Sequence, residues 1–258
     1  MSTAAAHSLF PYDDEGKFVE RIAAFLGRGA ELGDASLAVV DRAKWDMLCE
    51  GLGDGAPHVA YANRDEAYTR PEETLATYDA LLRRTVDEGA PAVRLYGELP
   101  RCETPEQRDT WIRYEALLNP VFAQCPVTIV CGYDLREHSE DVVAGAWHTH
   151  PTVLADTAAD NPRYEDPAQI VEATTVAPEP LPDLCEVSVD DDRAAFADRL
   201  RGELNAAHGN GGAADALLPA AMEVFANAQT HGQGARAQRL GRVGERVVWE
   251  LSDNGPGC

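Results

Sequence analysis

Between residues 7 and 150, short apolar runs alternate with amphipathic helical segments, and this alternation constrains the fold more than any other feature. The runs at 35–40 (ASLAVV), 92–98 (AVRLYGE) and 126–134 (PVTIVCGYD) are typical of buried strands. Apolar residues recur at helical spacing between these runs. The pattern predicts an α/β domain with a mostly parallel sheet that helices cover on both faces.

The composition changes after this region. Residues 152–191 are rich in proline and acidic residues, contain Arg163 as their only basic residue, and predict an extended, self-repelling linker. Residues 192–258 show a second pattern, in which two amphipathic helices precede a hairpin with alternating apolar residues. We therefore expect a domain at 7–151, the linker, and a smaller, partial α+β module.

The chain carries 44 acidic and 22 basic residues, which gives a formal net charge of −22. This excess repels phosphate groups, so direct nucleic-acid binding and association with an anionic membrane are not expected. The sequence has neither a long apolar run nor the features of a signal peptide. Its six cysteines are scattered without a CxxC pair, which indicates reduced thiols. These features predict a cytoplasmic protein that acts through protein partners.

Polar residues lie where two of the predicted strands end. Arg94 and Glu98 belong to one strand, and Tyr133 and Asp134 end another. Ligands of open α/β sheets bind at the carboxyl ends of strands, so these four residues are candidates for a binding site. The alternative is a structural network, in which arginines pair with glutamates and the tyrosines belong to the core.

Several short motifs occur in a consistent order across the first domain. They are His7-Ser-Leu-Phe10, the segment from Gly29 to Val40, Arg94-Leu-Tyr-Gly97-Glu98, the segment from Trp111 to Asn119, Cys131-Gly-Tyr133-Asp134 and His150-Pro151. Together they resemble the MEDS sensory domain, which occurs in regulators of methanogens, methylotrophs and actinobacteria. The resemblance implies a RecA/KaiC-like α/β core that senses small hydrocarbon-derived ligands. No GxxxxGK[ST] motif occurs, so RecA-like ATP hydrolysis is not expected.

The expected ligand site combines the strand-end residues with polar residues of the other motifs. A small-molecule enzyme that uses Tyr133, Asp134 and a histidine is the alternative to a pure sensor, although no recognised set of nucleophile, base and orienting group accompanies them. The candidate ligand-binding residues are His7, Arg94, Glu98, Tyr114, Glu115, Asn119, Tyr133, Asp134 and His150.

The histidines and cysteines of this domain do not predict a zinc site. His148-Thr-His150 lacks the i, i+4 spacing of a helical ligand pair, and in an extended segment its two histidines would point to opposite faces. No second compact ligand pair accompanies them near Cys131, Asp134 or His138. Cys131 is expected to be a small buried apolar residue, with a nucleophilic role as the alternative.

In the last module, Glu223, Asn227 and His231 follow one another at i, i+4 steps and therefore lie on one helix face. Asp253 follows an apolar strand and leads into a glycine turn that contains Gly255. An amide and a carboxylate on one face suit a hydrated Mg²⁺, and an aspartate beside glycines can accept a hydrogen bond from an exocyclic amine. The alternative is a solvated helix face followed by an ordinary turn.

The order of these residues resembles the GHKL ATP-binding family, specifically its anti-sigma-factor serine kinases, which carry E-x-x-x-N-A-x-x-H and D-x-G-x-G boxes. The resemblance implies that Glu223 is the general base, that Asn227 holds Mg²⁺ and that Asp253 recognises adenine. His231, Gly255 and Gly257 complete the two boxes. The chain stops at Cys258, before the family's ATP lid and second glycine box, so we expect binding of ATP and Mg²⁺ to be weak or absent and the kinase to be inactive.

These resemblances together predict a cytoplasmic signalling regulator. Binding of a small-molecule ligand would change the affinity of the GHKL-like module for a sigma factor or for an anti-sigma antagonist protein. In an intact module, the γ-phosphate of ATP would be transferred to a serine or threonine of the antagonist. A homodimer is a further expected assembly.

Overall fold

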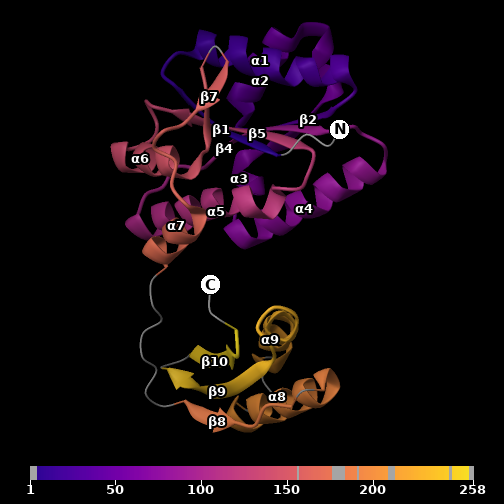
Figure 1. Cartoon of the computed structure of the whole chain (residues 1–258), viewed down its shortest axis with the longest axis vertical. Coiled ribbons are helices and arrows are strands. Elements are labelled where there is room, and N and C mark those ends of the chain that lie inside the picture. Colours follow the sequence, from indigo (N-terminus) through magenta and orange to yellow (C-terminus); the bar gives the residue numbers. More distant parts are fainter. Residues whose placement is uncertain are drawn as a thin grey trace. The chain divides into compact units, whose positions relative to one another are not determined.

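A computed structural model describes residues 5–155, 157–175, 184–190, 192–208, 213–243 and 246–255 of the chain (Figure 1). These residues belong to two compact units, Met1–Val176 and Ala177–Cys258. Each unit has its own sheet and its own core. In the described part of the chain, no helix has the length and apolar character needed to cross a bilayer.

The first unit is built on a seven-stranded sheet with the strand order β3-β2-β4-β5-β1-β6-β7. Every neighbouring pair is parallel except β6 and β7. The predicted mostly parallel sheet is therefore confirmed. The strands are β1 (Ala6–Tyr12), β2 (Ala35–Val40), β3 (Val59–Asn63), β4 (Val93–Glu98), β5 (Val127–Asp134), β6 (Thr152–Leu154) and β7 (Ala158–Asp160).

Helices cover both faces of this sheet, as the alternation predicts. Figure 1 shows α1 and α2 on one side of the sheet and α4 and α5 on the other. Alternate side chains of each strand therefore enter two separate cores, so that Phe10 packs toward α1 while Leu9 packs toward α5 and α6. The helices are α1 (Glu15–Leu32), α2 (Arg42–Leu52), the 3₁₀ helix η1 (Gly53–His58), α3 (Arg64–Ala67), α4 (Pro71–Asp87), α5 (Pro105–Phe122), α6 (Glu140–Thr149) and α7 (Pro167–Thr174).

Local sequence signals set the ends of several helices. The Asp14 and Asp41 carboxylates accept hydrogen bonds from backbone N–H groups in the first turns of α1 and α2. Thr104 and Gln107 form a capping box at the start of α5. Gly33 ends α1 with a φ angle of 78°, a left-handed conformation that glycine adopts without strain. These helix ends are therefore set by residues within one turn of each end.

The first unit continues beyond residue 151, where the composition predicts a linker. β6 extends the sheet next to β1, and α7 packs against α5 with Ile170 buried. The Asn161 amide also donates hydrogen bonds to the carbonyls of Trp147 and His150, at 2.6 and 2.7 Å. The acidic, proline-rich composition of 152–175 does not prevent folding, because strand pairing, one apolar anchor and these hydrogen bonds hold the segment to the domain.

The second unit consists of β8 (Cys185–Val187), α8 (Arg193–His208), α9 (Ala213–Thr230), β9 (Ala235–Val243) and β10 (Arg246–Asp253). Its antiparallel sheet has the strand order β10-β9-β8. Phe196 of α8 and Phe225 of α9 stack with ring centroids 4.1 Å apart, and Trp249 of β10 packs edge-on against Phe196. The predicted pair of helices and the hairpin are confirmed.

Candidate functional site

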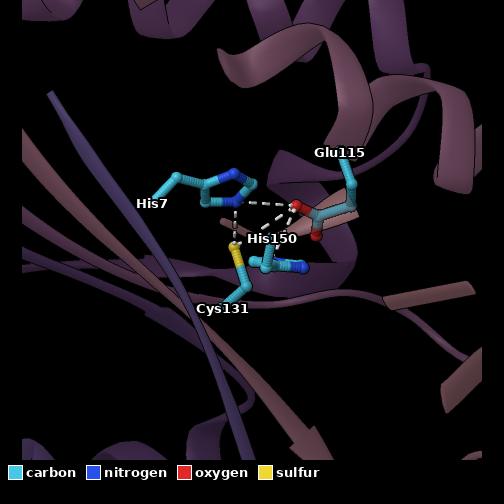
Figure 2. Close-up of side chains that lie close together, drawn as sticks. All are labelled: His7, Glu115, Cys131 and His150. Carbon is cyan, nitrogen blue, oxygen red and sulfur yellow. Dashed lines mark hydrogen bonds and ion pairs between the residues drawn. The ribbon is translucent and has the colours of Figure 1, made fainter. Parts of the chain in front are cut away.

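Four side chains from separate parts of the first unit meet inside it (Figure 2). His7 lies on β1 and Cys131 on the neighbouring β5, and both side chains point to the sheet face that α5 covers. Glu115 projects from α5, and His150 follows the last residue of α6. We call these four residues the His–Glu–Cys–His cluster.

The polar atoms of the cluster lie within hydrogen-bond distance of one another. His7 Nε2 is 3.1 Å from Glu115 Oε2 and 3.3 Å from Cys131 Sγ. Glu115 Oε2 is 3.4 Å from Cys131 Sγ and 3.4 Å from His150 Nε2. One ligand atom from each residue can be chosen so that all four lie within 4.8 Å of one another. The cluster is therefore a compact convergence of nitrogen, oxygen and sulfur atoms.

Outer hydrogen bonds fix the orientation of both imidazoles. Asn119 donates from its amide nitrogen to the Thr149 carbonyl at 2.8 Å, so its Oδ1 is free to accept from His7 Nδ1 at 3.1 Å. His150 Nδ1 donates to the Ala146 carbonyl at 2.7 Å. Since both Nδ1 atoms carry the proton in the neutral rings, both Nε2 atoms present a lone pair to the cluster.

Burial governs the charges of the cluster, whose four residues are at most 6% exposed. Burial and the neighbouring His150 lower the pKa of His7, which favours its neutral form. Burial opposes ionisation of Glu115, but His150 and His7 outweigh it and hold the pKa of this carboxyl below its ordinary value. Burial and the adjacent Glu115 raise the pKa of the Cys131 thiol. The Tyr133 hydroxyl donates to Glu115 Oε1 at 3.2 Å.

A second polar network lies at the carboxyl ends of the strands, on the opposite face of the sheet. Its centre is Glu98, whose Oε1 accepts hydrogen bonds from the hydroxyls of Tyr12 and Tyr96, each at 2.6 Å. Lys44 donates to Glu98 Oε2 at 2.6 Å although it is itself buried. A Cβ atom at Gly132 would collide with the Tyr96 hydroxyl, so glycine is required there. We call this arrangement the Glu98 network.

Asp134 and Arg64 extend the Glu98 network. Arg136 donates two hydrogen bonds to the Asp134 carboxylate, at 2.8 and 2.7 Å, and Lys44 lies 3.6 Å from it. Hydrogen bonds from Arg136 lower the pKa of Asp134 to about 2 despite its burial. Arg64 lies 3.5 Å from Glu98 and 3.7 Å from Glu137. The network is held together by charge pairs across the ends of β1, β2, β4 and β5.

The structure thus divides the predicted ligand-binding residues. His7, Glu115, Asn119, Tyr133 and His150 are brought together at the His–Glu–Cys–His cluster. The other four lie elsewhere: Glu98 and Asp134 belong to the Glu98 network, Arg94 pairs with Asp34 at 2.9 Å near the start of β4, and Tyr114 packs edge-on against Trp111 and Tyr68 in the core.

The expected structural pairing of arginines with glutamates takes a different form. Glu98 is paired with Lys44 and Arg64 rather than with Arg94. Arg113, two residues before Glu115 on α5, donates to the Thr174 carbonyl at 2.7 Å. Neither Lys44 nor Arg64 was predicted, because nothing in the local sequence brings α2 and α3 to the end of β4.

Cys131 is the one residue of the His–Glu–Cys–His cluster that was not among the predicted ligand-binding residues. Its predicted burial in the apolar core is confirmed, but its thiol also contacts the polar side chains of His7 and Glu115. Cys131 and Tyr133 share one face of β5 by strand alternation, which is the signal that could have found it. His148 ends outside the cluster, half-exposed and 2.8 Å from Glu165.

In the second unit, Glu223 and Asn227 lie on α9, and His231 follows it. The end of α9 lies beside Asp253, because a Cβ atom at Gly232 would collide with the Asp253 carboxylate. The Asn254 N–H also donates to the Gly232 carbonyl at 2.9 Å. Glu223, Asn227, His231 and Asp253 are all exposed.

The two boxes of the second unit are therefore neighbours. The Gly255 N–H donates to Asp253 Oδ1 at 3.0 Å, which closes the turn after β10. Gly257 lies outside the described residues. The roles assigned to these residues by resemblance stay predictions.

A comparison with curated proteins found no match to this chain. Residues 6–151 match the profile of the MEDS family, which is described as the MEthanogen/methylotroph, DcmR Sensory domain. The match covers more than half of the chain and includes all four residues of the His–Glu–Cys–His cluster. The chain therefore belongs to the MEDS family, whose description as a sensory domain indicates a role in sensing or signalling.

Proposed function

We propose that this chain is a signalling regulator in which the MEDS domain binds a small molecule and the second unit acts on a protein partner. The observation that carries the proposal is the match of residues 6–151 to a sensory domain family. The net charge of −22 favours a protein partner over a nucleic acid, because it repels phosphate groups.

The carboxyl ends of the strands are the proposed site of ligand binding. Several polar atoms there are buried and form no hydrogen bond with the described residues: Arg64 Nε and Nη1, Glu137 Oε2 and His138 Nδ1. Arg64 Nη1 is held by longer ion pairs with Glu98 and Glu137, at 3.5 and 3.7 Å. Buried polar groups are normally paired, so these atoms offer hydrogen bonds to a bound molecule. The guanidinium favours a small ligand with an oxygen acceptor, such as a short alcohol, aldehyde or carboxylate.

Native mass spectrometry of the purified full chain tests this part of the proposal. We expect the wild-type chain to retain small organic molecules, or its melting temperature to rise when short oxygenated compounds are added. Both the retention and the rise in melting temperature should be smaller in Arg64→Gln. Arg28→Gln is the matched control, because Arg28 is exposed and forms a surface ion pair with Glu31. If the wild-type chain neither retains nor responds to any such compound, the sensing site is refuted.

The second unit is the proposed output module, of the GHKL anti-sigma type. Three features support this: the order of its elements, the exposed ladder of Glu223 and Asn227 on α9, and the contact between Gly232 and Asp253. ATP and Mg²⁺ would be held by Asn227 and Asp253, and a sigma factor or an anti-sigma antagonist would be the partner. The bound nucleotide would supply a phosphoryl group for transfer to the partner, or its binding would create the form of the second unit that the partner recognises.

Binding of labelled ATP with Mg²⁺ to the full chain tests the output module. We expect weak binding, because Asn227 and Asp253, the residues proposed to hold the nucleotide, are both exposed to solvent. Micromolar binding that is lost in Asn227→Ala and in Asp253→Ala, but kept in Gln229→Ala on the same helix, would instead establish an active nucleotide site. Strong binding that survives both substitutions would refute the assignment of the two boxes.

A further inference from the structure

We propose that the His–Glu–Cys–His cluster is a binding site for a four-coordinate, thiophilic divalent cation, with Zn²⁺ as the preferred ion. The ligand atoms would be His7 Nε2, Glu115 Oε2, Cys131 Sγ and His150 Nε2. The proposal rests on the geometry of the cluster and does not depend on the identity of the sensed molecule or on the output module.

The spacing of the donor atoms matches tetrahedral coordination. Zinc lies about 2.0–2.1 Å from imidazole nitrogen and carboxylate oxygen and about 2.3 Å from sulfur, so tetrahedral donors are separated by roughly 3.3 Å, or by roughly 3.6 Å where one is sulfur. Four of the separations in the cluster, between 3.1 and 3.4 Å, lie within about 0.3 Å of these values. Figure 2 shows the four side chains converging from four separate segments on one point.

The balance of hydrogen-bond donors and acceptors in the cluster also favours a bound cation. When both imidazoles are neutral, Glu115 Oε2 and the two Nε2 atoms are all acceptors, and the Cys131 S–H is the one proton they share among the described atoms. Among the described residues, His150 Nε2 accordingly has no hydrogen-bond donor, although His150 is fully buried and the atom lies 3.4 Å from the acceptor Glu115 Oε2. Such an excess of buried acceptors is unfavourable, and a bound cation satisfies all of them at once.

Charge balance selects a divalent ion. Binding releases the Cys131 proton, because the thiolate is the metal ligand. Two positive charges on the metal then balance one thiolate and one carboxylate, so the buried site has no net charge. The mixture of sulfur and nitrogen donors suits zinc and disfavours Mg²⁺ and Ca²⁺, which prefer oxygen ligands.

The outer hydrogen bonds complete the resemblance to a metal centre. Metal-bound histidines usually donate their other ring N–H to a carbonyl or carboxylate, and here His7 donates to Asn119 and His150 donates to the Ala146 carbonyl. Tyr133 donates to the second oxygen of Glu115, which orients the first oxygen toward the cluster. Since four protein donors leave no open position, the geometry assigns a structural site that ties β1, α5, β5 and the end of α6 together.

Metal analysis and Co²⁺ substitution of the full chain test the site. We expect the purified chain to contain zinc in stoichiometric amount, and the metal-free chain to bind Co²⁺ with the ligand-field bands of a tetrahedral ion and a thiolate-to-cobalt charge-transfer band. Cys131→Ser should abolish the charge-transfer band, whereas Cys125→Ser, just before the same strand, should keep it. His150→Gln should abolish binding, whereas His148→Gln should keep it.

Asn119→Leu provides a variant that leaves every donor in place. Loss of an outer hydrogen bond typically weakens metal affinity roughly 10–100-fold, so this variant should retain the Co²⁺ spectrum at lower affinity. The proposal is overturned if the wild-type chain binds neither Zn²⁺ nor Co²⁺ in equilibrium dialysis, or if Cys131→Ser keeps the charge-transfer band. Because the decisive readout is the wild-type chain itself, a variant that fails to fold does not remove the test.

Discussion

Lys44→Met removes the buried cation from the Glu98 network and leaves the rest of the side chain apolar and similar in size. Lys44 is 7% exposed and Glu98 is 1% exposed, and the ammonium lies 2.6 Å from the carboxylate. The substitution therefore leaves a buried carboxylate without its closest counter-ion. Its remaining partners are the hydroxyls of Tyr12 and Tyr96 and the more distant guanidinium of Arg64.

The expected cost follows from these partners. Removing one member of a buried ion pair typically costs about 3–5 kcal/mol, because the other charge stays buried and uncompensated. Two hydroxyl donors and Arg64 at 3.5 Å still stabilise the Glu98 carboxylate, so we expect the lower end, about 3 kcal/mol. The double variant Lys44→Met/Glu98→Gln should lose less than the single one, because no buried charge is left unpaired.

Native-state hydrogen exchange, read by mass spectrometry on peptides covering β4 and β5, measures the free energy of opening in the first unit alone. Lys44→Met should reduce this free energy, and the double variant should recover part of the loss. A loss below about 1 kcal/mol in Lys44→Met, the size of an exposed ion pair, would refute the reasoning. The reasoning would also be refuted if the free energy of opening lost in the double variant equalled the sum of the losses in Lys44→Met and in Glu98→Gln.

Three further predictions concern other contacts. Gly132→Ala should destabilise the first unit by about 1–3 kcal/mol because its methyl group meets the Tyr96 hydroxyl, and adding Tyr96→Phe should restore part of the loss in urea unfolding. Burial lowers the pKa of His138 to about 4, below the value of about 6.5 expected when the chain is unfolded. The stabilising effect of a neutral His138 is therefore complete above about pH 6.5 and is lost as the pH falls toward 4, by up to about 3 kcal/mol. Urea unfolding across this range, with chelator present, should show a steeper decline for the wild-type chain than for His138→Gln; equal slopes would contradict it. Phe225→Ala should cost about 3–5 kcal/mol in the second unit, since Phe225 is buried against Phe196; unchanged exchange of α8 amides would contradict it.

Local patterns in the sequence account for most of the secondary structure. Alternating apolar runs and helical stripes determine the strands and helices of the first unit, and short-range signals such as Thr104 at α5 determine their ends. These signals act over a few residues, so they can be read without knowing the fold. The linker expected over 152–191 is wrong over 152–175, where the chain is folded, and the reason is a long-range contact. Composition does not reveal that α7 finds a partner in α5, which is distant in the sequence.

The candidate site was predicted only in part, and strand geometry explains why. Tyr133 and Asp134 are adjacent in β5 but point to opposite faces, so one joins the His–Glu–Cys–His cluster and the other the Glu98 network. Arg94 and Glu98 share a face of β4 but lie four residues apart, roughly 13 Å along a strand, so they cannot share a small ligand. Alternation and rise per residue are general properties of a strand. Once β4 and β5 are recognised, alternation separates Tyr133 from Asp134, and distance along the strand separates Arg94 from Glu98.

The sequence by itself therefore determined the α/β class, the family and the residue types available for chemistry, because these depend on local periodicity and on motifs. Only the tertiary structure decided that Cys131 lies next to His7, Glu115 and His150. Their positions are separated by up to 143 residues (7 to 150) and are joined by the pairing of β1 with β5 and by the packing of α5 and α6. Such contacts depend on strand order and on which face a helix covers, and both are consequences of long-range packing that no short segment of the chain encodes.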